Sequence, residues 1–193
     1  RSAFGRAEMY AEKYIADPKH IEVQLLGDGT GDVIHLFERD CSLQRRHQKV
    51  IEFAPSIAVP EHQRAKLFDY ALTLGRKLDL ESATTAEFLI SDDGQIFFIE
   101  INPRIQVEHT VTEEITGIDL VQSQLRIAGG ETLTDLKLTQ ETIAVHGLAM
   151  QCRITTENPA KDFAPDHGKL LAYRSASGFG IRLDAGSAFA GAI

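Results

Sequence analysis

A stretch of thirteen residues from Phe97 to His109 constrains the fold of this chain more than any other part. Apolar side chains alternate there with chemically active ones, namely Glu100, Asn102, Arg104, Gln106 and Glu108. In an extended strand alternate side chains point to the same face, so all five would line one surface. Such groups are costly to bury unless a divalent cation, phosphates or a small oxyanion partners them. The run therefore predicts either a chemical surface on a strand or the solvated face of an ordinary half-exposed sheet.

A second strand is expected directly before this one. The segments Thr85–Ile90 and Gln95–Asn102 both have the pattern of β-strands, and Asp93 and Gly94 lie between them. Asp-Gly is a strong signal for a two-residue hairpin turn. The two strands are therefore expected to form an antiparallel hairpin, and its register can be counted back from the turn.

That register places Glu87 directly opposite Glu100. Side chains opposed across an antiparallel ladder have Cβ atoms only ~5 Å apart. Two carboxylates at that distance repel each other unless a cation or a proton lies between them. With Asn102 on the same face, the set offers hard oxygen ligands for Mg²⁺ or Mn²⁺. The alternative is a one-residue bulge that puts the two glutamates on opposite faces, paired with surface lysines.

Two further strands are expected nearer the start of the chain. Residues 20–26 alternate cleanly, which predicts a half-buried strand with Ile21, Val23 and Leu25 inward and His20, Glu22 and Gln24 outward. The glycine-rich segment Gly27–Asp32 predicts a turn into a second strand over Val33–Glu38. A phosphate-binding loop is the weaker interpretation of these glycines, because no helix start follows them.

Two helices are expected, and both are structural. Pro60 predicts the start of a helix whose apolar face continues to about Leu78. Asp119 is a suitable N-cap for a second helix, which would end at Gly129.

The composition limits the class of protein. The chain has 193 residues and a net charge of −8, which argues against a nucleic-acid surface, although the basic run Arg45–Lys49 could hold a small anion. Two cysteines are too few for a disulfide framework and indicate a reducing compartment. No segment is apolar over the roughly 18 residues that span a bilayer, and no secretory pattern is present. The chain begins at Arg1 and stops after a Gly- and Ala-rich stretch, so we expect a piece of something longer.

Five motif-like stretches follow one another along the chain, namely Glu12–Ile15, His20–Gln24, Glu38–Lys49, Glu100–His109 and Gln151–Ile154. In this order they resemble the biotin carboxylase family, and they extend over nearly the whole chain. Within that family, the segments His109–Gly117 and Cys152–Glu157 and the proline after Asn102 resemble the biotin carboxylase domains of pyruvate carboxylases. Acyl-CoA carboxylases, which more often have a proline after the histidine, are the next alternative.

The resemblance implies an α+β fold of the ATP-grasp type, mainly an antiparallel sheet with flanking helices, present here as an incomplete fragment. It implies the end of a lid subdomain at residues 1–11, an ATP-grasp core at 12–140 and the start of a C-terminal subdomain at 141–193. The implied reaction is ATP-dependent carboxylation of protein-linked biotin with bicarbonate through carboxyphosphate. In pyruvate carboxylases this is the first half-reaction on the way from pyruvate to oxaloacetate.

The resemblance also assigns roles to individual residues. The adenine of ATP would be held by the backbone of Glu12, Lys13, Tyr14 and Ile15, with Leu89 against the ring. Three residues would lie near the ribose and phosphates, namely His20, Gln44 and His47. Divalent cations would be bound by Glu87 and Glu100 with Asn102 beside them, in agreement with the hairpin register.

The same resemblance implies a bicarbonate site and a base. Bicarbonate would be held by Lys49, Arg104, Gln106 and the backbone of Val107, since a cation and a guanidinium fork suit a small oxyanion. Glu108 would be the general base that deprotonates bicarbonate. Arg153 would stabilise the enolate oxygen of biotin. An exposed, salt-bridged arginine is the plainer interpretation of Arg153 from the residues alone.

The implied partners are bicarbonate and the biotinyl carrier and carboxyltransferase domains of the same long chain, in a homotetramer in the cytoplasm or the mitochondrial matrix. Because the family's lid and N-terminal subdomain do not precede Arg1, we expect this stretch alone to lack biotin carboxylation activity. Two other readings stay open: a different ATP-grasp ligase, and a non-catalytic module that keeps a metal or nucleotide site.

Overall fold

The computed structural model describes residues 11–186 and 189–191 and divides into two compact units, with the boundary in the chain between Arg153 and Ile154. The predicted lid segment 1–11 lies, apart from Ala11, outside the described residues. The subdomain boundaries expected at 11/12 and 140/141 stay predictions. Among the described residues, no helix combines the length and the apolar character that crossing a membrane requires.

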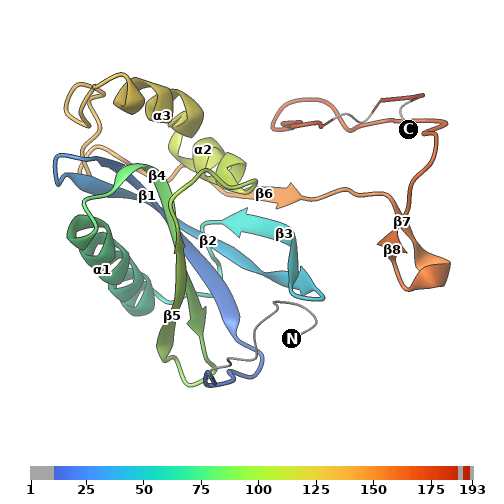
Figure 1. Cartoon of the computed structure of the whole chain (residues 1–193), viewed down its shortest axis with the longest axis horizontal. Helices are drawn as coiled ribbons and strands as arrows, with labels where there is room; N and C mark the ends of the chain where they lie inside the picture. Colours follow the sequence, from blue (N-terminus) through green and yellow to red (C-terminus); the bar gives the residue numbers. More distant parts are fainter. Residues whose placement is uncertain (1–10, 187–188, 192–193) are drawn as a thin grey trace, which may run out of the picture. The chain divides into compact units, whose positions relative to one another are not determined.

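The first unit is built on one antiparallel sheet of six strands in the order β5-β4-β1-β2-β3-β6 (Figure 1). The strands are β1 Lys19–Asp28, β2 Val33–Arg45, β3 Gln48–Ala54, β4 Glu81–Ile90, β5 Ile96–Asn102 and β6 Ala149–Cys152. The helices are α1 Glu61–Lys77, α2 His109–Thr116 and α3 Leu120–Ala128. The second unit holds the short pair β7 Glu157–Asn158 and β8 Ala164–Pro165 around the 3₁₀ turn η1 Pro159–Lys161.

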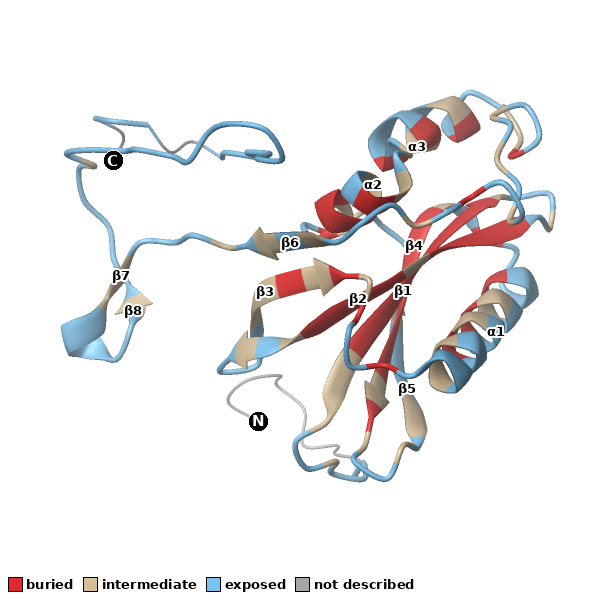
Figure 2. Ribbon diagram, turned by 180° about the vertical axis from the view of Figure 1, so that it is seen from behind, coloured by how far each residue is buried: buried red, intermediate tan, exposed pale blue. Residues whose placement is uncertain are grey.

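Helices cover both faces of the sheet, so its central strands are buried (Figure 2). On one face, alternate apolar residues of β1 such as Ile21 and Val23 pack with Leu67 of α1. On the other face, Leu26 of β1 packs with Leu120 and other residues of α3. A strand covered on both sides has no face open to solvent. The polar side chains of these central strands are therefore buried and must find partners inside the protein.

The prediction that β1 is half-buried is wrong. Glu22 and Gln24, expected to point to solvent, are completely buried. They face Arg39 of the neighbouring strand β2, whose guanidinium donates hydrogen bonds to both side chains. Alternation identified the two faces of the strand correctly, but it could not tell that the polar face is covered as well.

The predicted pairing of Glu87 with Glu100 is confirmed, although by a different route from the one expected. The turn holds three residues rather than two, since Ser91 pairs with Gln95. Gly94 closes it with φ +82°, a conformation that glycine adopts without strain. A register shift between Glu87 and Phe88 then moves the pairing by one residue and brings the glutamates together. The alternative in which a bulge separates them is therefore wrong.

The extended strand expected from Phe97 to His109 ends early. β5 stops at Asn102, and residues 103–108 form a loop that leads into α2. Pro103 has no N–H to donate to the ladder, which accounts for the end of the strand. The five active side chains therefore do not line one strand face. Two lie on or at the end of β5, and the others lie in the loop.

Elements β3, β6 and α2 were not predicted. β2 continues to Arg45, and Arg46 and His47 form a two-residue hairpin turn with φ of 52° and 61°. Two left-handed residues are typical of a type I′ turn, but the sequence lacks the Asn-Gly signal that usually identifies one. The helices expected from Pro60 and Asp119 are confirmed as α1 and α3, and the Asp119 side chain caps α3 by accepting from Gln122 N.

Replacing Gly27 by alanine is expected to destabilise the protein by about 2 kcal/mol, because an added methyl overpacks a closed site. A Cβ at Gly27 would lie only 2.2 Å from the carbonyl oxygen of Leu80, which is backbone and cannot swing away. Urea unfolding measures the effect. Gly186→Ala is the control, since a Cβ there meets no atom within 4 Å. Equal stability of Gly27→Ala and the parent protein would contradict this packing.

Candidate active site: a lysine among carboxylates

The centre of the site is the ammonium group of Lys49, which lies near the start of β3 and is mostly buried. It donates to Glu22 of β1, to Glu87 Oε1 of β4 at 3.3 Å, and to Glu108 Oε1 at 2.9 Å. Glu108 is the residue immediately before α2. One cation therefore holds three carboxylates that come from distant parts of the chain. Buried carboxylates in such numbers need further positive groups.

Arg153 supplies one of these groups. Its Nη2 donates to Glu108 Oε2 at 2.9 Å, and its Nε donates to Glu52 Oε1 at 2.6 Å. The strand β6 pairs with β3, and the Arg153 N–H binds Val50 O at 3.0 Å, which brings this end of the unit beside Glu52. Arg153 is salt-bridged and partly exposed, as the plainer interpretation expects, but both its partners are buried.

The two glutamates bound to Arg153 differ in how readily they ionise. Burial raises the pKa of Glu52, and the Arg153 guanidinium opposes the rise only in part. Burial also acts to raise the pKa of Glu108, but the hydrogen bond and charge of Lys49, aided by Arg39, hold it below its usual value. Glu108 is thus ionised at neutral pH, with each oxygen bound to a cation.

Glu87 has four hydrogen-bond partners. Its Oε2 lies 2.7 Å from His20 Nε2, and its Oε1 accepts from Gln106 Nε2 at 2.9 Å and Asn102 Nδ2 at 2.8 Å, besides Lys49. Burial acts to raise the pKa of Glu87, but the bond from His20, the charge of Lys49 and the bond from Gln106 outweigh it and lower the pKa to about 2. Glu87 is therefore a fixed negative charge.

The predicted metal ligands Glu87, Glu100 and Asn102 lie together. Asn102 Nδ2 donates to Glu87 Oε1 at 2.8 Å and to Glu100 Oε1 at 3.0 Å, so both carboxylates converge on one point that carries positive partial charge. Glu100 itself is exposed, which leaves that point open to solvent. Carboxylate oxygens converging at a solvent-accessible point suit Mg²⁺ or Mn²⁺, which keep several waters or substrate oxygens.

A second group of ligand atoms also lies close together, namely those of His20, Glu22 and Glu87 within 4.8 Å of one another. Lys49 donates to both of these glutamates, so its ammonium already occupies the place that a cation would take among these three side chains. The structure therefore favours the side of Glu87 that faces Glu100 for a metal ion.

His20 is oriented from both sides. Gln44 Nε2 lies 2.8 Å from His20 Nδ1 and also donates to the carbonyl oxygen of Cys41 at 2.9 Å. Because an amide nitrogen only donates, Nδ1 accepts and the proton lies on Nε2, which then donates to Glu87. His47, predicted to join these residues near the phosphates, lies at the exposed tip of the β2–β3 turn. A continuous extended strand would place Gln44 and His47 on opposite faces, and the turn at Arg46 and His47 interrupts that strand.

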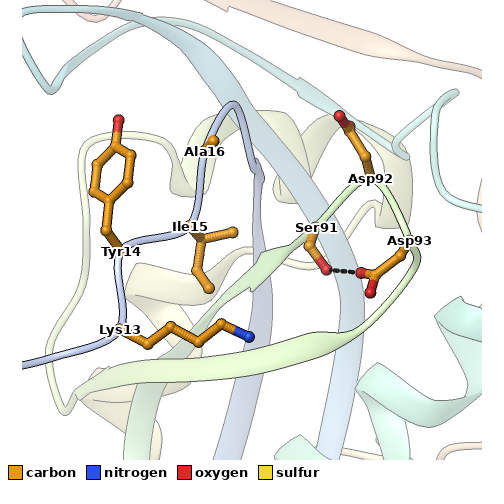
Figure 3. Close-up of a pocket in the computed structure, with 7 residues that line it drawn as sticks. All are labelled: Lys13, Tyr14, Ile15, Ala16, Ser91, Asp92 and Asp93. Atoms are coloured by element: carbon orange, nitrogen blue, oxygen red, sulfur yellow. Dashed lines mark hydrogen bonds between the residues drawn. The ribbon is translucent and has the colours of Figure 1, made fainter.

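An open pocket of about 320 Å³ lies between the segment Lys13–Ala16 and the β4–β5 turn at Ser91–Asp93 (Figure 3). The ammonium of Lys13 lies 4.8 Å from the centre of the Phe97 ring, which anchors the segment on β5. The predicted residues Lys13, Tyr14 and Ile15 line this pocket. Glu12 and Leu89 are not among its lining residues, and Leu89 is placed on β4 by its pairing with His20.

Arg104 and Val107, two of the residues predicted to hold bicarbonate, are exposed. The Arg104 guanidinium donates weakly to Asn102 Oδ1 at 3.4 Å and to Ile105 O at 3.3 Å. Gln106, between them, is buried and reaches Glu87. The loop thus places alternate residues inward and outward although it is not a strand.

Sequence reasoning missed Glu22, Arg39 and Glu52, which are all completely buried. One signal was available: Glu38, Arg39 and Asp40 follow one another in the middle of a strand, between Phe37 and Cys41. Consecutive charges in such a strand place at least one charged side chain on each face.

A family model described as the ATP-binding domain of the carbamoyl-phosphate synthase L chain matches residues 1–136. The chain belongs to this family. Pyruvate carboxylase 1 of Caenorhabditis elegans is 58% identical over 193 residues, which are 100% of this chain and 16% of that protein. Human mitochondrial pyruvate carboxylase is 52% identical over 192 residues, again 100% of this chain and 16% of the relative. The chain thus spans about a sixth of the curated relatives it matches.

Solved structures agree with this membership. A complete multifunctional pyruvate carboxylase from Rhizobium etli matches with a TM-score of 0.90 and 49% identity, over 100% of this chain and 19% of that chain. The biotin carboxylase domain of the Hydrogenobacter thermophilus 2-oxoglutarate carboxylase, solved with MgADP and bicarbonate, matches with a TM-score of 0.86 and 49% identity over 94% and 39% of the two chains. The predicted resemblance to biotin carboxylases and the ATP-grasp fold are thereby confirmed.

Proposed function

We propose that this chain is part of an enzyme that carboxylates protein-linked biotin, using ATP to activate bicarbonate as carboxyphosphate. The observation that carries the proposal is the Lys49 ammonium held among Glu22, Glu87 and Glu108, with Arg153 on the far oxygen of Glu108. It combines cationic groups for an oxyanion with an ionised base in one buried place. The similarity to a biotin carboxylase domain solved with bicarbonate and MgADP supports the same assignment.

Bicarbonate would take the place of Glu108 as the hydrogen-bond acceptor of Lys49. The Lys49 ammonium, the Gln106 amide, the Arg104 guanidinium and the Val107 N–H are the donors proposed to hold it. When bicarbonate takes the Lys49 contact, Glu108 loses the bond that lowers its pKa most, and its affinity for a proton rises. The carboxylate then accepts the bicarbonate proton as a general base, so that substrate binding itself prepares the base.

ATP would lie with its base against the segment Glu12–Ile15 and Leu89, and its ribose and phosphates near His20, Gln44 and His47. The oxygens of Glu87, Glu100 and Asn102 would hold Mg²⁺ or Mn²⁺, which neutralises charge on the transferring phosphoryl group. The pKa of about 2 keeps Glu87 ionised for this task at any physiological pH.

Arg153 would serve the biotin half of the reaction. Its guanidinium is partly exposed, so it can reach a substrate while Glu52 and Glu108 hold it in place. A fixed cation beside the biotin carbonyl would stabilise the enolate oxygen as N1′ loses its proton.

The complete enzyme is proposed to be a pyruvate carboxylase, with a biotinyl carrier and a carboxyltransferase domain as partners on one long chain that forms a homotetramer. The identities of 58% and 52% with two pyruvate carboxylases support pyruvate as the acceptor, ahead of an acyl-CoA. The human relative is named as mitochondrial, which supports the mitochondrial matrix, with the cytoplasm as the alternative.

The test is a chimaera in which the matched segment of the Rhizobium etli enzyme is replaced by this chain. We expect ATP hydrolysis that depends on bicarbonate, and formation of carboxybiotin. The parent enzyme is the positive control, and the 193-residue chain alone is expected to give no carboxybiotin.

Other outcomes would identify the competing functions. ATP hydrolysis that is indifferent to bicarbonate would favour a different ATP-grasp ligase. An inert, folded chimaera beside an active parent would favour a non-catalytic nucleotide-binding module.

A further inference from the structure

Arg39 of β2 has a completely buried side chain, the largest of that kind among the described residues. Its guanidinium donates to Gln24 Oε1 at 2.6 Å, Thr112 Oγ1 at 3.0 Å, Thr85 Oγ1 at 3.1 Å, Gln106 Oε1 at 3.2 Å and Glu22 Oε2 at 3.2 and 3.3 Å. These partners come from β1, β4, α2 and the loop before α2. The proposed reaction has no direct use for Arg39, because none of it is exposed to a substrate.

The contact with Gln106 fixes which way that amide points. A guanidinium has only donors, so the Gln106 atom that faces Arg39 must be the oxygen. The nitrogen then faces Glu87 Oε1 at 2.9 Å, and an ionised carboxylate can only accept. Both neighbours therefore require the same orientation. Without Arg39, the amide would keep only the requirement set by Glu87.

The contact with Glu22 has a similar effect on Lys49. Arg39 binds Glu22 Oε2 through two nitrogens, which leaves Oε1 for the Lys49 ammonium. The carboxylate cannot turn toward solvent, because it is completely buried. Arg39 thus sets the position of the carboxylate against which Lys49 rests.

We propose that Arg39 is a positioning residue for the oxyanion site: it orients two of the four groups that would hold bicarbonate, Gln106 directly and Lys49 through Glu22. This inference rests on the proposed function and adds a residue to it. The planar fork of arginine is required, because one side chain must serve acceptors on several sides at once. A lysine at this position would retain the charge but could not serve the same acceptors.

The experiment measures the kinetics of Arg39→Lys in the chimaera. We expect the KM for bicarbonate to rise roughly 10-fold, as for the loss of one or two hydrogen bonds to a charged donor, while the KM for ATP changes less than about 2-fold. A purely structural arginine would lower the melting temperature and the fraction of active enzyme without changing the KM for one substrate selectively.

A double-mutant cycle identifies the route. Arg39→Lys is combined with Gln106→Ala, and we expect the second change to add less than about 2-fold to the KM for bicarbonate. Equal effects of Arg39→Lys in both backgrounds would overturn the role of Gln106. Thr112→Val is the matched control, since it removes one acceptor of Arg39 on α2 and leaves Gln106 and Glu22 untouched. It is expected to leave the KM for bicarbonate unchanged.

A second variant keeps the proposal testable if Arg39→Lys does not fold. In Gln106→Glu, Arg39 would hold one carboxylate oxygen and so turn the other toward Glu87. We expect the KM for bicarbonate to rise roughly 10-fold, because the site loses an amide donor and gains a carboxylate that repels an anion. A KM equal to that of the parent chimaera would overturn the proposal. Absence of bicarbonate-dependent hydrolysis in the unmutated chimaera would instead overturn the proposed function itself.

Discussion

Replacing Lys49 by methionine is expected to lower bicarbonate-dependent ATP hydrolysis by about 100-fold or more. Methionine keeps much of the length of lysine but not the charge, so the site loses a fixed donor of the kind whose removal costs 10²- to 10³-fold in other enzymes. The change also leaves Glu22, Glu87 and Glu108 facing one another without the ammonium between them. Steady-state kinetics of the chimaera at varied bicarbonate concentration measure the loss.

The same substitution has a consequence for ionisation. Lys49 is among the causes that lower the pKa of both Glu87 and Glu108, so in Lys49→Met both pKa values are expected to rise. Lys66→Met, on the exposed part of α1, is the control and should retain activity within about 2-fold. If Lys49→Met kept the parent's KM for bicarbonate and its kcat, Lys49 would have no part in the reaction.

The helices α1 and α3 and the two hairpins β1–β2 and β4–β5 were largely predictable from the sequence. Local signals carried them: proline and glutamate at the start of α1, Asp119 before α3, and alternation with glycine turns in the two hairpins. The pairing of Glu87 with Glu100 came out correctly although two assumptions in it were wrong. The turn is longer by one residue and a bulge in the ladder compensates, so two errors of register cancelled.

The parts that could not be predicted depend on contacts between distant segments. Whether Glu22 faces solvent or a guanidinium is decided by how β2 pairs with β1 and by the helices that cover that face. Arg153 reaches Glu108 only because β6 adds to the edge of β3 across about a hundred residues of chain. Motif resemblance gave Lys49, Glu108 and Arg153 their roles, whereas alternation singled out Glu108 but neither Lys49 nor Arg153. Glu22 and Arg39 lie inside the matched stretches, but neither signal showed that they are buried and orient these groups.

Glu87 is expected to make the stability of the protein depend on pH in the acidic range. Its pKa is lowered from 4.5 to about 2 in the folded state. A carboxyl group with a lowered pKa stabilises the folded state fully above its unfolded value, and this contribution is lost as the pH falls toward the folded value. Over pH 4.5 to 2 the folded state should therefore lose about 3 kcal/mol through Glu87 alone. Urea unfolding at a series of pH values measures this.

The variant Glu87→Gln separates this group from the other acids. A glutamine has no proton to take up, so the part of the pH dependence that belongs to Glu87 should disappear. At neutral pH the variant should be less stable than the parent, because His20 and Lys49 lose a charged partner. Glu81→Gln, at the exposed start of the same strand, is the matched control and should follow the parent at every pH. If Glu87→Gln kept the acid dependence of the parent, the low pKa would belong to another group, and the fixed negative charge proposed for the metal ion would lose its support.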